Sequence, residues 1–156
     1  MKILIDADAC PVVSIVEEIA QQYQVPLLLI CDTSHIIDTE YGELITVDKG
    51  ADSVDFFLIN KAKKKDIIVT QDYGVAAMAL GKGAYAIHQS GKWYTEKNID
   101  QMLFERHMSK KARRSSGKFH GKGPRKRTVE DDLQFRNSFQ KLIEKVLGQM
   151  KEEKEG

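Results

Sequence analysis

The sequence lacks any run of about 18 apolar residues, so we expect no membrane-spanning helix. Asp6 interrupts the first apolar stretch, which argues against a secretory signal and favours a cytoplasmic location. The two cysteines, Cys10 and Cys31, are too few for a disulfide framework and have no partners at zinc-finger spacing. With 156 residues, 42% of them hydrophobic and 30% charged, the chain can form one globular domain with its own core.

Acidic residues are missing from one segment, although the net charge of the whole chain is only +1. Residues 106–127 hold ten Lys or Arg and no Asp or Glu, whereas residues 1–105 hold 9 basic and 16 acidic residues. An acidic body with a basic arm can bind a polyanion and hold it near bound cations. The candidate phosphate contacts in this arm are Arg113, Arg114, Lys118, Lys122, Arg125 and Lys126.

The first 105 residues alternate between strand-like and helix-like patterns. Short apolar runs predict buried strands at residues 2–5, 27–31, 44–47, 67–70 and 84–87. Helical periodicity predicts helices that begin at Pro11, cover 50–64 and 75–80, and lie near 99–104. This alternation predicts a three-layer α/β/α fold with a mostly parallel sheet.

The remainder of the chain predicts an arm and a docked helix. Residues 106–127 are basic and contain Gly and Ser, residues 128–150 form an amphipathic helix, and residues 151–156 form a charged tail. Thr128 and Asp131 resemble a capping box at the start of this helix. Its apolar residues are Leu133, Phe135, Phe139, Leu142, Ile143, Val146 and Leu147, which must pack against the rest of the protein.

Acidic residues from three segments are predicted to meet at one edge of the sheet. Asp6 and Asp8 follow the first strand, and Asp72 follows the 67–70 strand. Asp52 and Asp55 open the helix that leads into that strand, so they lie at the same edge. In open parallel sheets, ligands bind at the carboxyl ends of the strands.

Such a cluster of carboxylates is typical of a site for Mg²⁺ or Mn²⁺, which prefer oxygen ligands. Without a cation, crowded carboxylates raise one another's pKa values. A bound ion can activate water and stabilise charge on a phosphodiester, so the acids and the basic arm together suggest nucleic-acid hydrolysis. RNA is favoured over DNA as the partner. Three of the acids also have a structural explanation, since Asp52 and Asp55 suit a first helical turn and Asp72 suits an N-cap. Asp6 and Asp8 are harder to explain structurally, because two acids directly after a buried strand are costly without a function.

Three motifs resemble the YaiI/YqxD family of bacterial proteins. They are Asp6-Ala7-Asp8-Ala9-Cys10-Pro11, Lys49-Gly50-Ala51-Asp52-Ser53-Val54-Asp55 and Val69-Thr70-Gln71-Asp72-Tyr73-Gly74. The resemblance extends over nearly the whole chain and implies a core similar to PIN-like nucleases, which cleave RNA or DNA with a metal ion.

The PIN-like pattern implies roles for individual residues. It matches Asp6 after the first strand, Asp52 or Asp55 at the central helix, and Asp72 with Thr70 two residues before it. By this resemblance the acids are metal ligands, Asp8 is a further ligand or base, and Thr70 positions water or substrate. The pattern's fourth acid has no clear counterpart near residues 89–92, so the number of metal ions and the activity itself stay open.

Two other functions compete with the nuclease. A haloacid-dehalogenase-type phosphatase would use Asp6 and Asp8 as nucleophile and general acid, although Cys10-Pro11 departs from that pattern. A non-catalytic nucleic-acid-binding module would need only the basic arm, which can equally be a solvated segment. Cys10 near a helix N-terminus has no local histidine partner, which favours packing over a nucleophilic role. The sequence leaves open the substrate and whether the chain forms a homo-oligomer.

Overall fold

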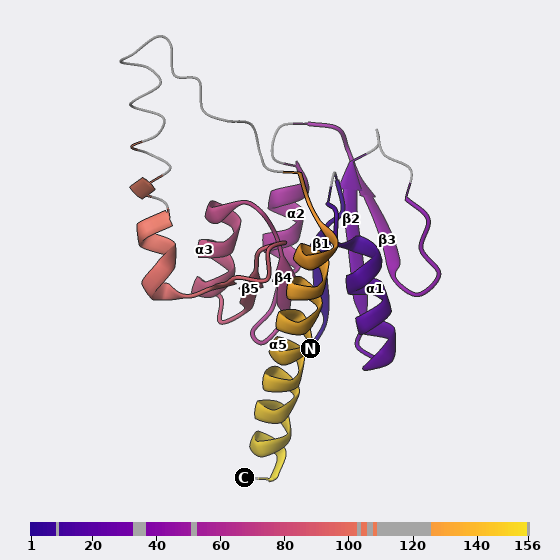
Figure 1. Cartoon of the computed structure of the whole chain (residues 1–156), viewed down its shortest axis with the longest axis vertical. Coiled ribbons are helices and arrows are strands. Elements are labelled where there is room, and N and C mark those ends of the chain that lie inside the picture. Colours follow the sequence, from indigo (N-terminus) through magenta and orange to yellow (C-terminus); the bar gives the residue numbers. More distant parts are fainter. Residues whose placement is uncertain are drawn as a thin grey trace.

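The computed structural model describes residues 1–8, 10–32, 37–50, 53–102, 104–105, 108 and 126–155. Figure 1 shows a central sheet with helices packed on both of its faces. The sheet has six strands in the order β3-β2-β1-β4-β5-β6. The strands are β1 (Ile3–Asp6), β2 (Leu27–Asp32), β3 (Glu43–Val47), β4 (Ile67–Val69), β5 (Tyr85–Ile87) and β6 (Trp93–Tyr94).

Strand β1 lies at the centre of the sheet and pairs in parallel with β2 and β4. Its register aligns Asp6 with Ile30 of β2 and Ile5 with Val69 of β4. The β2–β3 and β4–β5 pairs are also parallel, whereas β5 and β6 are antiparallel. The predicted α/β fold with a mostly parallel sheet is therefore confirmed.

Each face of the sheet has its own hydrophobic core, because side chains alternate between faces along each strand. Ile3 and Ile5 face helices α1 (Val13–Gln22) and α5 (Val129–Glu155), which lie side by side (Figure 1). Leu4 faces the opposite core, formed with α2 (Ser53–Lys61), α3 (Tyr73–Gly81) and the helical residues 96–102. These helices and the sheet make the three layers that the sequence predicts.

Helix α5 completes the first core with its apolar stripe. Phe135, Phe139, Leu142, Ile143 and Val146 are buried, whereas Leu133 is 53% exposed and does not join them. The capping box at its start is confirmed: Thr128 N donates to Asp131 Oδ2 across 2.8 Å, and Asp131 N donates to Thr128 Oγ1 across 3.3 Å. Although α5 continues to Glu155, neither it nor any other helix in the described part is long and apolar enough to cross a membrane.

Two element predictions were wrong in detail, and one strand was not predicted. Helix α1 begins at Val13, so Pro11 precedes the helix instead of opening it. Helix α2 ends at Lys61 and not near residue 64, because Lys63 N donates to the Asp66 carboxylate and Lys65 has a positive φ of 72°. Strand β6 was not predicted, since two residues are too few to show a periodic pattern.

Candidate functional site

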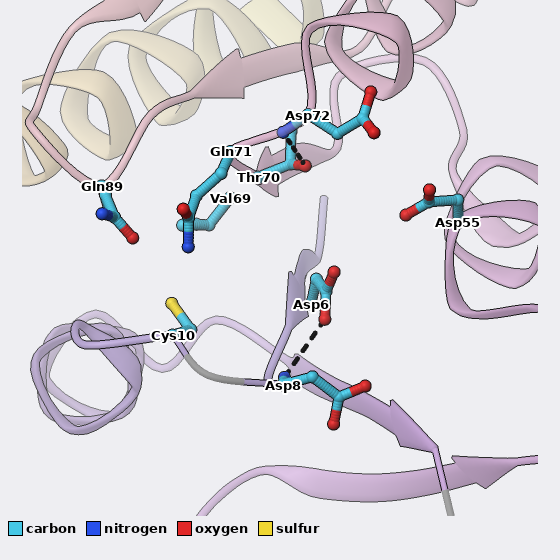
Figure 2. A pocket seen from close by; sticks show the side chains of 9 residues that line it. All are labelled: Asp6, Asp8, Cys10, Asp55, Val69, Thr70, Gln71, Asp72 and Gln89. Carbon is cyan, nitrogen blue, oxygen red and sulfur yellow. Dashed lines mark hydrogen bonds between the residues drawn. The ribbon is translucent and has the colours of Figure 1, made fainter. Parts of the chain in front are cut away.

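A cavity of about 220 Å³ opens at the carboxyl ends of β1 and β4. These two strands lie next to each other, and the helices that follow them, α1 and α3, pack on opposite faces of the sheet. Such a crevice is where open α/β sheets bind ligands. The lining residues, shown in Figure 2, are Asp6, Asp8, Cys10, Asp55, Val69, Thr70, Gln71, Asp72 and Gln89.

Asp6 and Asp8 are oriented by backbone amides at the ends of the strands. Asp8 N donates to Asp6 Oδ1 across 3.1 Å, and Asp32 N, at the end of β2, donates to Asp8 Oδ2 across 3.2 Å. The pKa of Asp6 rises from 3.8 to about 6. Burial is the main cause, and the negative charges of Asp8, Asp55 and Asp72 add to it against the lowering effect of the Asp8 amide. The predicted electrostatic crowding is thus present around Asp6.

Asp72 combines a structural role with a place in the cavity. Its Oδ1 atom caps α3 by accepting hydrogen bonds from Gly74 N at 2.8 Å and Val75 N at 3.1 Å. The N-cap explanation for Asp72 is therefore correct. Because the cap engages one oxygen, the carboxylate can still present its other oxygen to a ligand.

Thr70 is 4% exposed and supports the loop that carries Asp72. Its Oγ1 atom accepts a hydrogen bond from Asp72 N across 3.0 Å, and its carbonyl oxygen accepts one from the Tyr94 hydroxyl across 3.1 Å. Tyr94 belongs to β6, the strand that the sequence did not reveal. Thr70 lines the cavity as expected, and its hydroxyl holds the Asp72 backbone.

Asp55 reaches the cavity from the first turn of α2. Figure 2 shows its carboxylate directed toward the space near Asp6 and Asp72. Between the two acids that compete for one role in the sequence, the structure brings Asp55 to the cavity, whereas Asp52 lies outside the described residues. Asp6, Asp8, Asp55 and Asp72 therefore meet at one place from three segments of the chain.

The carboxylates surround a space instead of closing tightly on one point (Figure 2). Within the described ranges, no group of three or more His, Cys, Asp or Glu side chains is arranged to hold a metal ion. The donor set is nevertheless composed of carboxylate oxygens, which Mg²⁺ and Mn²⁺ prefer. Mg²⁺ commonly keeps several water ligands and takes only one or two carboxylates from the protein.

The neutral end of the cavity, which is formed by Cys10, Gln71 and Gln89, was not predicted from the sequence. Burial raises the pKa of the Cys10 thiol, so the thiol stays protonated, and the side chain packs against the α1/α5 core. Gln71 and Gln89 follow the ends of β4 and β5. Their position two residues after the ends of buried strands was the available signal, but it is a weaker signal for an amide than for an acid.

The described end of the basic segment lies close to this neutral end. Arg127 donates from its guanidinium to the Gln89 carbonyl oxygen across 3.0 Å, and Lys126 beside it is exposed. The other predicted phosphate contacts lie outside the described residues: Arg113, Arg114, Lys118, Lys122 and Arg125.

Comparison with known proteins identifies relatives over almost the full length of the chain. Residues 4–145 match the family described as "Uncharacterized BCR, YaiI/YqxD family". A UPF0178 protein from Clostridium acetobutylicum is 63% identical over 143 residues, which cover 92% of this chain and 97% of the relative. A UPF0178 protein from Lachnoclostridium phytofermentans is 50% identical over 147 residues, covering 94% of this chain and 99% of the relative. No solved structure matches the chain, so the PIN-like core stays a prediction.

Proposed function

This chain belongs to the YaiI/YqxD family, and we propose that it is a Mg²⁺- or Mn²⁺-dependent nuclease that hydrolyses phosphodiester bonds, with RNA preferred over DNA. The observation that carries the proposal is the cavity in which Asp6, Asp8, Asp55 and Asp72 converge at the carboxyl edge of the sheet. Burial is the main cause of the raised pKa of Asp6, and repulsion from Asp8, Asp55 and Asp72 adds to it. A divalent cation would relieve this repulsion.

The width of the acid cluster favours a partly hydrated ion that also contacts the substrate. A Mg²⁺ ion with one or two carboxylate ligands, several waters and a substrate phosphate fits such an arrangement. The candidates for these one or two carboxylate ligands are Asp6, Asp55 and the oxygen of Asp72 that does not cap α3. When bound, the ion supplies an activated water and stabilises negative charge on the phosphodiester.

The remaining groups orient these ligands and handle protons. The Asp8 amide holds Asp6, and Asp32 N holds one oxygen of Asp8, so both carboxylates enter the reaction with fixed directions. Asp8 is the proposed further ligand or general base for the attacking water. Thr70 keeps Asp72 in place through the Asp72 amide. The exposed Lys126 and the basic arm would attract the phosphate backbone.

The test is a titration of Mn²⁺ into the wild type and into Asp6→Asn, followed by assays of both on single-stranded RNA. We expect Asp6→Asn to bind Mn²⁺ at least tenfold more weakly and to lose cleavage, because a central ligand charge is removed. Asp100→Asn is the matched control, since Asp100 is exposed and lies in the helical residues 96–102 away from the cavity.

The outcomes separate the metal site from the reaction. Equal Mn²⁺ affinity in wild type and Asp6→Asn would contradict the acid site. Metal binding without cleavage of any nucleic acid would contradict only the nuclease. Hydrolysis of phosphomonoesters together with a trapped aspartyl-phosphate on Asp6 would show that the protein is a phosphatase and not a nuclease. RNA binding that survives Asp6→Asn without any cleavage would instead indicate a binding module.

A further inference from the structure

The cavity has two chemically different ends. Figure 2 shows the carboxylates of Asp6, Asp8, Asp55 and Asp72 around one end and Cys10, Gln71 and Gln89 at the other. The side-chain amides of Gln71 and Gln89 point toward a common space that the Cys10 sulfur also faces (Figure 2). The two side-chain amides at this end carry no formal charge. This end therefore suits a neutral, polar part of a ligand.

The Gln89 amide has an unmet hydrogen-bonding requirement. Its Oε1 atom is buried and has no hydrogen-bond partner among the residues that the structure describes. Nearly all buried side-chain polar atoms in folded proteins are paired with the protein, with water or with a ligand. Gln89 lines the cavity, so a rotation of its side chain toward the open space would let a hydrogen-bond donor on a bound molecule supply the missing partner.

Both glutamines stand on backbone that is held in place. Gln89 belongs to the β5–β6 hairpin, in which His88 N donates to Lys92 O across 2.9 Å. Arg127 holds the Gln89 carbonyl and also pairs with Asp132, through its Nε atom and Oδ1 at 2.6 Å. Gln71 lies between Thr70 and Asp72, whose hydrogen bond closes the turn around it. A binding group on fixed backbone loses less entropy when it engages a ligand.

We propose that Gln71 and Gln89 form a nucleoside-binding subsite beside the acid cluster. The two amides hydrogen-bond to a base edge or a ribose hydroxyl of the nucleotide whose phosphate lies at the carboxylates. This inference rests on the proposed function and extends it to recognition of the nucleoside. Carboxamides offer both a donor and an acceptor, which is how Asn and Gln read adenine and how proteins contact bases and 2′-hydroxyls of single-stranded RNA.

A neighbouring hollow indicates the path that a bound nucleic-acid strand would take. It has a volume of about 240 Å³, shares Gln89 with the cavity and is also lined by Pro11, His88, Ser90, Arg127 and Asp131. A nucleic-acid strand that leaves the acids past Gln89 would enter this hollow and reach Arg127 and Lys126. The subsite therefore lies between the acids and the described end of the basic segment, where a nucleoside of the bound strand is expected.

The test measures binding of adenosine 5′-monophosphate in the presence of Mg²⁺ by calorimetry. Wild type should bind it more tightly than inorganic phosphate. Gln71→Met and Gln89→Met should each weaken this binding about threefold to tenfold, as expected for the loss of one or two neutral hydrogen bonds. Phosphate binding should be unchanged in both. The matched control, Gln22→Met, alters an exposed glutamine of α1 and should bind like wild type.

Two further ligands identify the group that is recognised. Deoxyadenosine monophosphate will bind more weakly than the ribonucleotide if the 2′-hydroxyl is the partner, whereas ribose 5-phosphate will bind weakly if the base is the partner. Gln71 is exposed, so Gln71→Met is expected to fold even if Gln89→Met does not. The subsite is wrong if wild type binds the nucleotide no more tightly than phosphate, or if folded Gln71→Met binds it as wild type does.

Cleavage assays on single-stranded RNA separate this inference from the nuclease. If the glutamine variants lose nucleotide affinity but no nucleic acid is cleaved, the nuclease is wrong and a nucleotide-binding subsite stands. If wild type cleaves RNA and the variants keep its KM and nucleotide affinity, the subsite is wrong and the nuclease stands. A raised KM together with weakened nucleotide binding supports both.

Discussion

Arg127 donates a hydrogen bond from its guanidinium to the carbonyl oxygen of Gln89, and the two groups are 3.0 Å apart. The bond connects the residue just before the α5 cap to the hairpin that borders the cavity, across 38 positions of sequence. The same guanidinium pairs with Asp132 at the start of α5. Arg127 thus links the start of the docked C-terminal helix to one wall of the proposed site, and Ser138 of α5 adds a second link through its hydrogen bond to the Gly91 carbonyl.

Arg127→Ala should loosen the β5–β6 hairpin, because it removes the bond to Gln89 and the ion pair with Asp132. We expect the free energy of unfolding to fall by about 1–2 kcal/mol. In hydrogen exchange, the amides of His88 and Gly91 should lose protection. The control is Arg136→Ala, which removes an exposed pair with Glu18 and should cost less than about 1 kcal/mol. Unchanged hairpin exchange in Arg127→Ala would contradict this supporting role.

Asp6→Asn should stabilise the metal-free protein at neutral pH. The pKa of Asp6 is about 6 in the folded state and 3.8 in the unfolded state. Between these two pH values the folded state holds a proton that the unfolded state has released. Ionised Asp6 therefore lowers stability as the pH rises from about 4 to 6, and the loss is complete above 6. Allowing for solvent screening, Asn should gain about 1–2 kcal/mol at pH 7.5.

The measurement for Asp6→Asn is urea unfolding in EDTA at pH 4 and pH 7.5. The gain should vanish near pH 4, where Asp6 is largely protonated in the folded protein. Asparagine keeps the acceptor for Asp8 N, so the substitution preserves that bond. Asp100→Asn serves again as the control, with no gain expected. If Asp6→Asn is less stable than wild type at pH 7.5, burial and the neighbouring charges do not disfavour the ionised Asp6 carboxylate.

Divalent metal should raise the thermal midpoint of the wild type. At a free Mn²⁺ concentration one hundred times the dissociation constant, the stabilisation is about 2.7 kcal/mol, which corresponds to several degrees for a chain of this size. Below pH 6 protons compete with the metal for Asp6, so the apparent Mn²⁺ affinity should fall about tenfold per pH unit. The shift of the thermal midpoint should become smaller accordingly. Differential scanning fluorimetry from pH 5 to 8 measures it. An equal shift in Asp6→Asn would place the metal elsewhere.

Thr70→Val should disturb the position of Asp72 without leaving a cavity in the core, because Val fills nearly the same volume as Thr. The substitution leaves the Asp72 amide without its acceptor and should cost about 1–2 kcal/mol. Thr70→Ser keeps the hydroxyl and should retain most of the stability and Mn²⁺ affinity. Chemical denaturation and metal titration of the two variants provide the comparison. If Val and Ser behave alike, the hydroxyl does not position Asp72.

The sequence itself determined the layered architecture and the edge at which the acids meet. Continuous apolar runs such as Leu27 to Cys31 are needed where a parallel sheet is covered on both faces, and β2 is indeed buried along this length. Polar residues that directly follow such runs lie at the carboxyl edge, which is why Asp6 and Asp72 could be assigned there. The capping box of Thr128 and Asp131 was predictable for the same reason: it depends on local spacing.

Tertiary structure alone decided which groups share the cavity and what else they do. The pairing of β1 with β4 sets Asp6 beside Thr70 and Asp72, and no local pattern encodes which strands become neighbours. The short strand β6 and the exposed Leu133 follow from packing across the sheet and against α5, not from periodicity. Gln89 is held at the site in part by Arg127, which comes from a distant segment. Contacts between distant segments depend on the whole folded chain, so they could not be predicted from local sequence.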